Sequence, residues 1–220
     1  AYALASCNLE PAPPPAPPKW CFASASFDRT VKVYHLTDPN LEFGVREVQT
    51  LEHDDLVNGV AFQPPHGDLM ASCDNSGTIY LWRQLRNGFS KRPTRIDAAH
   101  DSQIWSIQFS ADGRFAASCS TDRTIKVWQC CDGGFEPVAT LDGHTAAVWS
   151  IAFDASGDYL VSSSQDSTVR IWNWREEREV RKIVVGLQEN AGLRCQGMKI
   201  AEATGLSRLQ TDILQELGAQ

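Results

Sequence analysis

Short apolar segments, separated by turn residues, recur along the chain. The clearest set lies between His144 and Trp172, where apolar and polar residues alternate. This alternation predicts three consecutive strands, at Val148–Phe153, Tyr159–Ser164 and Thr168–Asn173. Because several of these segments carry apolar residues on both faces, we expect neighbouring layers to cover the strands on each side.

The same pattern is repeated earlier in the chain. It occurs at His100–Trp128 and, more loosely, at His53–Trp82, so that the closing tryptophans are about 45 residues apart. A fourth strand is expected after each unit, at 93–97, 136–141 and 180–185. Four-stranded propeller repeats have periods of roughly 40–45 residues. The sequence therefore predicts an all-β fold in which four-stranded sheets stand side by side.

These units resemble WD repeats. A His stands near the start of each unit, an Asp occupies the tight turn of the better units, and a Trp closes the third strand, as at His144, Asp166 and Trp172. The resemblance covers about residues 20–186 and implies a WD40 β-propeller with three complete repeats and one partial repeat. Because propellers have about four to eight blades, we expect an incomplete or open propeller.

The chain divides into six expected parts. Residues 1–19 hold a strand remnant and a Pro-rich insertion, 20–52 a partial WD repeat, 53–97, 98–141 and 142–186 the complete repeats, and 187–220 a closing segment. Residues 2–7 resemble an inner strand of the repeats. The sequence PAPPPAPP at 11–18 favours an extended linker, with a docking motif for an aromatic groove as the alternative.

The last part of the chain has a different pattern. Ser207 and Gln210 have the spacing of a helix capping box, and leucines and an isoleucine follow at helical spacing up to Leu217. We expect a short C-terminal amphipathic helix that closes the last blade, with a partner-binding helix as the alternative. Residues 194–219 also resemble the ending of cyanobacterial proteins with C-terminal WD repeats, including signalling NTPases of the NB-ARC or NACHT type.

In WD repeats a loop His, a strand Ser, a turn Asp and a strand Trp form one hydrogen-bonded chain. The resemblance implies two such networks: His100, Ser118 or Ser120, Asp122 and Trp128 in one repeat, and His144, Ser162 or Ser164, Asp166 and Trp172 in the next. Ser, His and Asp also make up hydrolase triads, but an active site is assembled once, whereas these residues recur with one spacing. We therefore expect the networks to stiffen the blades, and we predict no catalytic residue.

Two units depart from this pattern. In the second unit Ser76 stands where the turn Asp is expected, and the first unit closes with Tyr34 in place of Trp. Each change removes one member of the network. We expect these two blades to be less rigid than their neighbours.

Five positions are expected to face a partner protein. Asn58, Trp105 and Trp149 each lie five residues after the repeat His, where the resemblance places the start of the first strand. Tryptophan is enriched in interaction hot spots, and core packing between blades is the alternative. Arg29 and Arg123 directly follow the turn Asp and should emerge on the same face, where they can meet acidic groups of the partner.

Composition and charge argue against several classes of function. The net charge is −7 and no basic stripe of the kind that nucleic acids require is present. The seven cysteines include no CxxC pair and the five histidines no zinc pattern, so we expect no metal, no cofactor and no disulfide framework. No apolar run approaches the roughly 18 residues of a membrane span. The neighbouring residues Cys130 and Cys131 have no basic residue nearby that would activate a thiol. Because the sequence shows no disulfide framework, we expect the protein to reside in the reducing cytoplasm.

The leading hypothesis is a non-catalytic scaffold or sensor that recognises proteins as part of a larger signalling protein. A subunit of a cytosolic multiprotein assembly complex is the first alternative. A propeller enzyme is the second, and it would need a cluster of polar residues that does not repeat, which the sequence lacks. Because an open arc exposes strand edges and apolar faces, we also expect self-association.

Overall fold

The computed structural model of the protein describes residues 3–9, 19–36, 44–65, 67–85, 88–132 and 134–184. Within these ranges the secondary structure consists of 17 strands, and no helix occurs there. The Pro-rich insertion expected at 11–18 and the helix expected within 187–220 lie outside the described residues.

The strands form four antiparallel sheets, which we call blades I to IV in chain order. Blade I contains β1 (Ala3–Leu9), β2 (Lys19–Ala25), β3 (Thr30–Leu36) and β4 (Val45–Glu52). Blade II contains β5 (Val57–Phe62), β6 (Leu69–Asp74), β7 (Ile79–Leu85) and β9 (Thr94–Ile96), with the short β8 (Gly88–Phe89) also paired to β7. Blade III contains β10 (Ile104–Phe109), β11 (Phe115–Ser120), β12 (Ile125–Cys131) and β13 (Gly134–Leu141). Blade IV contains β14 (Val148–Phe153), β15 (Tyr159–Ser164), β16 (Thr168–Asn173) and β17 (Arg178–Val184).

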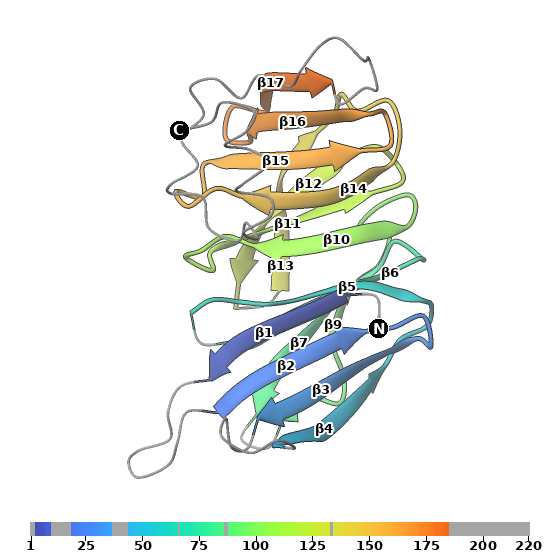
Figure 1. The fold of residues 1–220 in the computed structure, drawn as a ribbon, viewed down its shortest axis with the longest axis vertical. Helices are drawn as coiled ribbons and strands as arrows, with labels where there is room; N and C mark the ends of the chain where they lie inside the picture. Colours follow the sequence, from blue (N-terminus) through green and yellow to red (C-terminus); the bar gives the residue numbers. More distant parts are fainter. Residues whose placement is uncertain are drawn as a thin grey trace.

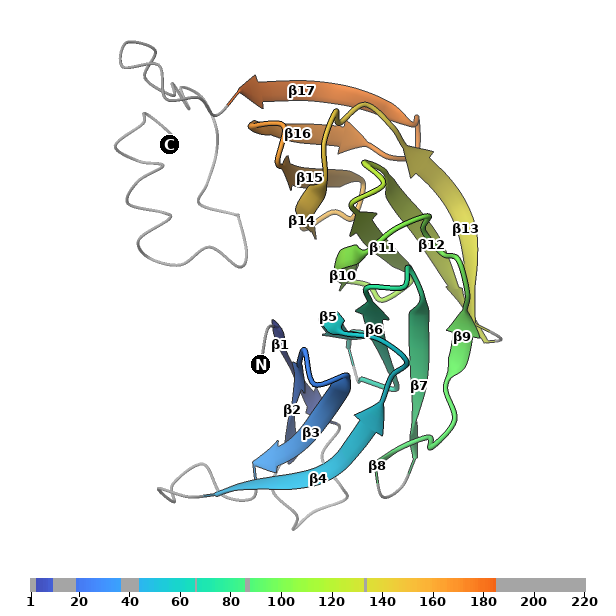
Figure 2. The ribbon, with the colours of Figure 1, turned by 90° about the vertical axis from the view of Figure 1, so that its right-hand side faces the viewer.

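The four blades stand side by side along the molecule (Figure 1) and together form an open arc (Figure 2). Figure 2 shows the first strand of each blade, β1, β5, β10 and β14, on the concave side of the arc, and β4, β13 and β17 on its convex side. Blades I and IV lie at the two ends of the arc and have a neighbour on one side only among the described residues. The fold is an open or partial β-propeller, as the repeat pattern predicts.

Blade I is a four-stranded sheet, although the sequence predicts only a partial repeat at 20–52. Its first strand is β1, which pairs with β2 from Ala3 opposite Ala25 to Leu9 opposite Lys19. The likeness of residues 2–7 to segments of later repeats correctly indicates a strand. Those segments form second strands, however, whereas β1 is a first strand. Both kinds of strand carry small residues because both pack between blades near the concave side.

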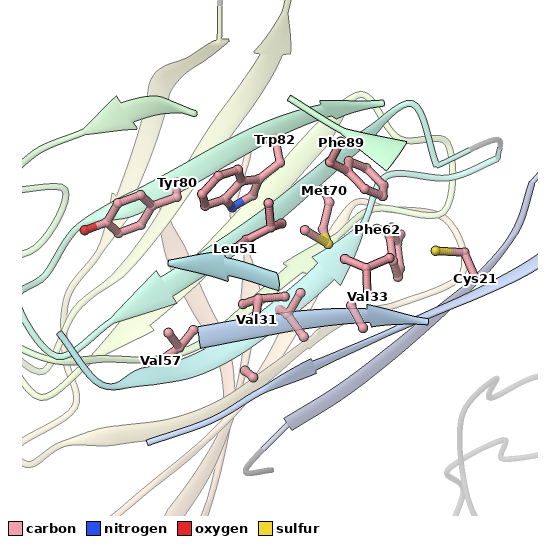
Figure 3. Packing of buried hydrophobic residues seen from close by; sticks show 13 residues of the cluster. Cys21, Val31, Val33, Leu51, Val57, Phe62, Met70, Tyr80, Trp82 and Phe89 are labelled. Carbon is pink, nitrogen blue, oxygen red and sulfur yellow. The ribbon is translucent and has the colours of Figure 1, made fainter. Parts of the chain in front are cut away.

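The hydrophobic core lies between neighbouring blades. Figure 3 shows Tyr80, Trp82 and Met70 of blade II packed against Val31 and Val33 of blade I. A second cluster joins blades II and III, and a third joins blades III and IV. Each sheet is therefore covered on both faces only where it has a blade on both sides.

Candidate protein-interaction face

Asn58, Trp105 and Trp149 occupy equivalent places in three blades. Each is the second residue of a first strand, and each is the extra residue of a β-bulge. The pairing with the second strand shifts across these residues, between Val57 and Gly59, Ile104 and Ser106, and Val148 and Ser150. A bulge leaves one residue outside the ladder and redirects its side chain. These three side chains therefore depart from the alternation that governs the rest of their strands.

The two tryptophans contact each other across the boundary between blades III and IV. The ring centroids of Trp105 and Trp149 are 4.6 Å apart and the rings are tilted by 48°. The indole N–H of Trp105 donates to Thr121 Oγ1 at 2.7 Å, which fixes its orientation. Trp149 keeps 41% of its surface exposed. The pair thus presents aromatic surface at the start of two neighbouring strands.

Asn58 takes a different role at the equivalent position of blade II. Its side chain is only 1% exposed, and its Nδ2 donates to Asn75 Oδ1 at 2.7 Å and to the Ile104 carbonyl at 2.9 Å. The second bond crosses to blade III. The expectation that Asn58 faces a partner is therefore wrong: because its short side chain reaches the neighbouring strand, it is buried between blades.

Arg29 and Arg123 lie exposed in the turns between second and third strands. Both have left-handed backbone angles, with φ of 67° and 75°. The preceding aspartates support these turns, since Asp28 accepts the Thr30 N–H at 3.0 Å and Asp122 accepts the Thr124 N–H at 2.9 Å. Arg123 belongs to the turn that begins beside Thr121, the partner of Trp105. We call the edge of the arc that carries these turns the turn edge.

Hydrogen bonds link the repeated polar residues of blade III. His100 Nδ1 lies 2.8 Å from Asp122 Oδ2, and His100 Nε2 lies 2.8 Å from Ser118 Oγ. Ser118 Oγ also accepts the indole N–H of Trp128 at 2.9 Å. A carboxylate only accepts, so Nδ1 of a neutral ring carries the proton and Nε2 accepts from the serine hydroxyl. The chain of bonds runs from the turn edge into the core.

Blade IV repeats this network at nearly the same distances. Its members are His144, Ser162, Asp166 and Trp172, with contacts of 2.7 to 2.8 Å. In both blades the serine that meets His is the earlier of the two candidates. The later ones, Ser120 and Ser164, instead accept the backbone N–H of the turn Asp and donate to carbonyls of the loop that carries His.

The charges of these networks follow from burial and hydrogen bonding. Burial alone would raise the pKa of Asp122, but hydrogen bonds with His100 and Thr124 outweigh it and hold this pKa well below its usual range. The pKa of Asp166 is lowered in the same way. Burial lowers the pKa of His144, although Asp166 acts in the opposite direction. At neutral pH blade IV therefore pairs an ionised carboxylate with a neutral imidazole.

Blade II has no carboxylate bonded to its histidine: His53 Nδ1 lies 3.3 Å from the Leu51 carbonyl, and Asp74 forms a separate group of hydrogen bonds. His53 Nε2 lies 2.7 Å from Ser72 Oγ, which accepts the Trp82 indole N–H at 2.8 Å. The turn position holds Ser76, as the sequence shows, but the fully buried Asp74 accepts its hydroxyl at 2.6 Å and the Tyr80 hydroxyl at 3.0 Å. Comparison of the repeats does not identify Asp74, because this residue stands two positions before the turn Asp of the other repeats.

The opposite edge of blades II and III holds a hollow of about 280 Å³. Its lining includes Asp68, Arg83, Cys130 and Cys131. Burial raises the pKa of Cys130 to about 12, and the pKa of Cys131 is also raised, which disfavours the thiolate form of both side chains. In the described part of the chain no three His, Cys, Asp or Glu residues are placed to hold a metal ion. No helix among those residues could cross a membrane.

Four-stranded blades that share cores with their neighbours and repeat one polar network define a repeat protein of the propeller class. A family model described as "WD domain, G-beta repeat" matches residues 45–83, 91–129 and 135–173, together just over half of the chain. The chain belongs to the WD40 repeat family. Each match starts in or just before the outermost strand of one blade and ends in the third strand of the next. One sequence repeat therefore ties two blades together.

Curated relatives match only part of their own length. The chain is 29% identical over 126 residues to "Probable cytosolic iron-sulfur protein assembly protein 1" of Candida glabrata, covering 54% of this chain and 37% of that protein. It is 31% identical over 129 residues to "RbAp48-related WD40 repeat-containing protein prw1" of Schizosaccharomyces pombe, covering 57% and 30%. It is 27% identical over 138 residues to the iron-sulfur assembly protein of Vanderwaltozyma polyspora, covering 54% and 40%. The chain thus spans less than half the length of these relatives.

Proposed function

We propose that the chain recognises other proteins through the turn edge of blades III and IV, where Trp105 and Trp149 meet. The main support for this interaction face is that the two rings contact each other across a blade boundary while Trp149 is 41% exposed. Neither ring belongs to the polar His–Ser–Asp–Trp networks, although Trp105 also packs against the core between blades III and IV. Large aromatic side chains are the commonest anchors of protein interfaces. Trp105 and Trp149 are the proposed anchors.

The partner that fits this surface presents an apolar side chain beside a carboxylate. The apolar group would cover the exposed part of Trp149. The carboxylate would pair with the exposed Arg123, whose guanidinium can bind both oxygens. Arg29 offers a second cation in the equivalent turn of blade I. A loop or chain end with mixed acidic and apolar character meets these requirements.

We place this recognition in a non-catalytic scaffold, and we favour a subunit of a cytosolic multiprotein assembly complex. The support is the name of two relatives, each called a probable cytosolic iron-sulfur protein assembly protein. The same names, together with the cysteines that the sequence leaves outside any disulfide framework, favour the cytoplasm. A sensor of a signalling protein, including one with an NB-ARC or NACHT domain, stays a prediction that rests on the C-terminal resemblance alone.

Replacing both tryptophans by alanine should reduce partner capture. The double variant Trp105→Ala, Trp149→Ala loses the aromatic surface and is expected to recover each specific partner at least about tenfold less well than the parent, as for hot-spot residues. The measurement is affinity capture from a cytosolic extract with quantitative mass spectrometry. The most enriched protein is then titrated directly against both forms to obtain the two dissociation constants.

A matched control separates this surface from general loss of apolar area. Leu85 and Val138 are 56% and 42% exposed and lie away from the turn edge. The double variant Leu85→Ala, Val138→Ala should leave capture unchanged. Equal recovery by the tryptophan variant and the parent, with both folded by circular dichroism, would reject the proposed face.

A further inference from the structure

The hollow between blades II and III is not part of the proposed interaction face. It has a volume of about 280 Å³ and lies at the edge of the arc opposite to the turn edge. The end of β7, the start of β9 and the residue before β6 line it from blade II, and the hairpin that joins β12 to β13 lines it from blade III. Both blades pack against a described neighbour on each side, so the hollow belongs to an internal boundary of the arc.

The hollow lies where the outer strand of blade II is interrupted. Blade III has one continuous outer strand, β13, of eight residues, whereas blade II has β8 and β9, of two and three residues. Gly134, the first residue of β13, stands across the boundary from the shortened strand. A Cβ atom at this position would lie 3.6 Å from Thr94 Cγ2 and 3.7 Å from Leu81 Cδ1. The missing side chain of Gly134 therefore leaves this space open.

The hollow has an apolar floor and a charged rim. Leu69 and Leu81 are buried, whereas Asp68, Arg83 and Asp132 are exposed. In the described part of the chain the side chains of these three charged residues form no hydrogen bond and no ion pair. Two carboxylates and one guanidinium therefore stand at one opening without a partner among the described residues.

Charge and size favour a basic side chain as the ligand. The two carboxylates outnumber the guanidinium, and the two cysteines have raised pKa values, so their thiols stay neutral and the rim is negative. The volume is just below the roughly 300–1,000 Å³ of pockets for drug-sized ligands, which fits one long side chain better than a nucleotide. An arginine has an apolar stem for the leucine floor and five N–H donors for carboxylate oxygens.

We propose that this hollow binds an arginine side chain of a partner polypeptide, with Asp68 and Asp132 paired to its guanidinium. The aliphatic stem of that arginine packs on Leu69 and Leu81. Because Arg83 repels an incoming cation, the partner residue beside the arginine is acidic and pairs with Arg83. This site is separate from the tryptophan pair, which lies on the turn edge.

Binding is measured by NMR of the isotope-labelled full chain, with short capped peptides as the probes. Acetyl-Gly-Arg-Glu-Gly-amide should bind with a dissociation constant of about 1 mM, since one side chain offers few contacts. It should shift the backbone amide signals of Arg83, Asp132 and Gly134 and leave the indole N–H signals of Trp105 and Trp149 unchanged. Acetyl-Gly-Gln-Gln-Gly-amide, which has no charge, should bind at least about tenfold more weakly.

Two variants test the hollow itself. The double variant Asp68→Asn, Asp132→Asn should weaken peptide binding about fivefold, as for the loss of two exposed ion pairs. Thr94→Tyr should fill the opening and abolish the shifts, and tyrosine suits a strand position, so this variant should fold. The matched controls are Asp101→Asn, at an exposed carboxylate on the turn edge, and Thr140→Tyr, at an exposed position of β13 outside the lining. Both controls should bind the peptide as the parent does.

Three results would overturn the proposal. The first is a parent chain whose signals do not shift with up to about 10 mM of the arginine peptide. The second is equal binding of the arginine and glutamine peptides, and the third is equal binding by the parent and the double variant. Shifts confined to Trp105 and Trp149 would also overturn it, because they would assign the peptide to the turn edge and leave the proposed interaction face standing.

Discussion

Replacing Ser118 by alanine should lower the free energy of unfolding by about 2–4 kcal/mol, although it removes a single oxygen atom. Ser118 is 0% exposed and its hydroxyl joins the His100 ring to the Trp128 indole. Without it, the indole N–H and His100 Nε2 are both left buried with no partner. An unsatisfied buried polar group costs about 1–3 kcal/mol, and this variant leaves two of them.

Urea unfolding at one fixed protein concentration, followed by tryptophan fluorescence, measures this change. The control is Ser156→Ala, which removes a hydroxyl from an exposed turn where it bonds only to Asp154 and the turn backbone. We expect that variant to change stability by less than about 0.5 kcal/mol. Equal destabilisation by the two variants would contradict a special role for the buried network.

The strands of the repeats could be predicted because one simple pattern fixes them. In blade IV the alternation of apolar and polar residues gives β14, β15 and β16 with their observed bounds. The fourth strands, β9, β13 and β17, differ from the predicted bounds by one or two residues at their ends. Their ends are less well defined because outer strands are more exposed and carry less of the apolar pattern.

The choice between paired serines could not be made from sequence. Ser118 and Ser120 are two residues apart on one strand, so their side chains point to the same face. Only the position of the His loop against the sheet decides which one meets the ring. That position depends on contacts between blades, such as the bond from the His100 N–H to the Gly77 carbonyl of blade II.

The sequence also could not determine which side chains of the candidate interaction face are exposed. Asn58, Trp105 and Trp149 share a place in the repeat, and the sequence treats them alike. The structure buries Asn58, because an amide can bond to the Ile104 carbonyl of the next strand. The two indoles instead contact each other, and Trp105 also packs against the core between blades III and IV. The same bulge position is therefore buried at Asn58, half-buried at Trp105 and exposed at Trp149, which the repeat pattern alone does not distinguish.

Lowering the pH from 7 to 4.5 should cost the fold about 2–3 kcal/mol through His53 alone. Burial lowers the pKa of this ring to about 4, against 6.5 for an unperturbed histidine. Between these two values the unfolded chain binds a proton that the folded chain does not, so the stability falls as the pH falls. His144, whose pKa is also lowered by burial, acts in the same direction. The carboxylates Asp122 and Asp166 have lowered pKa values and add to the loss only below about pH 3.8.

Urea unfolding at a series of pH values tests this, with His53→Gln as the matched variant. Glutamine retains a polar group near Ser72 but has no proton to bind in this range. The variant should be less stable than the parent at pH 7, yet lose roughly 2–3 kcal/mol less between pH 7 and 4.5, since the unfolded variant gains no proton at this position. Parallel curves for the two proteins would show that His53 is not the group responsible for the acid sensitivity.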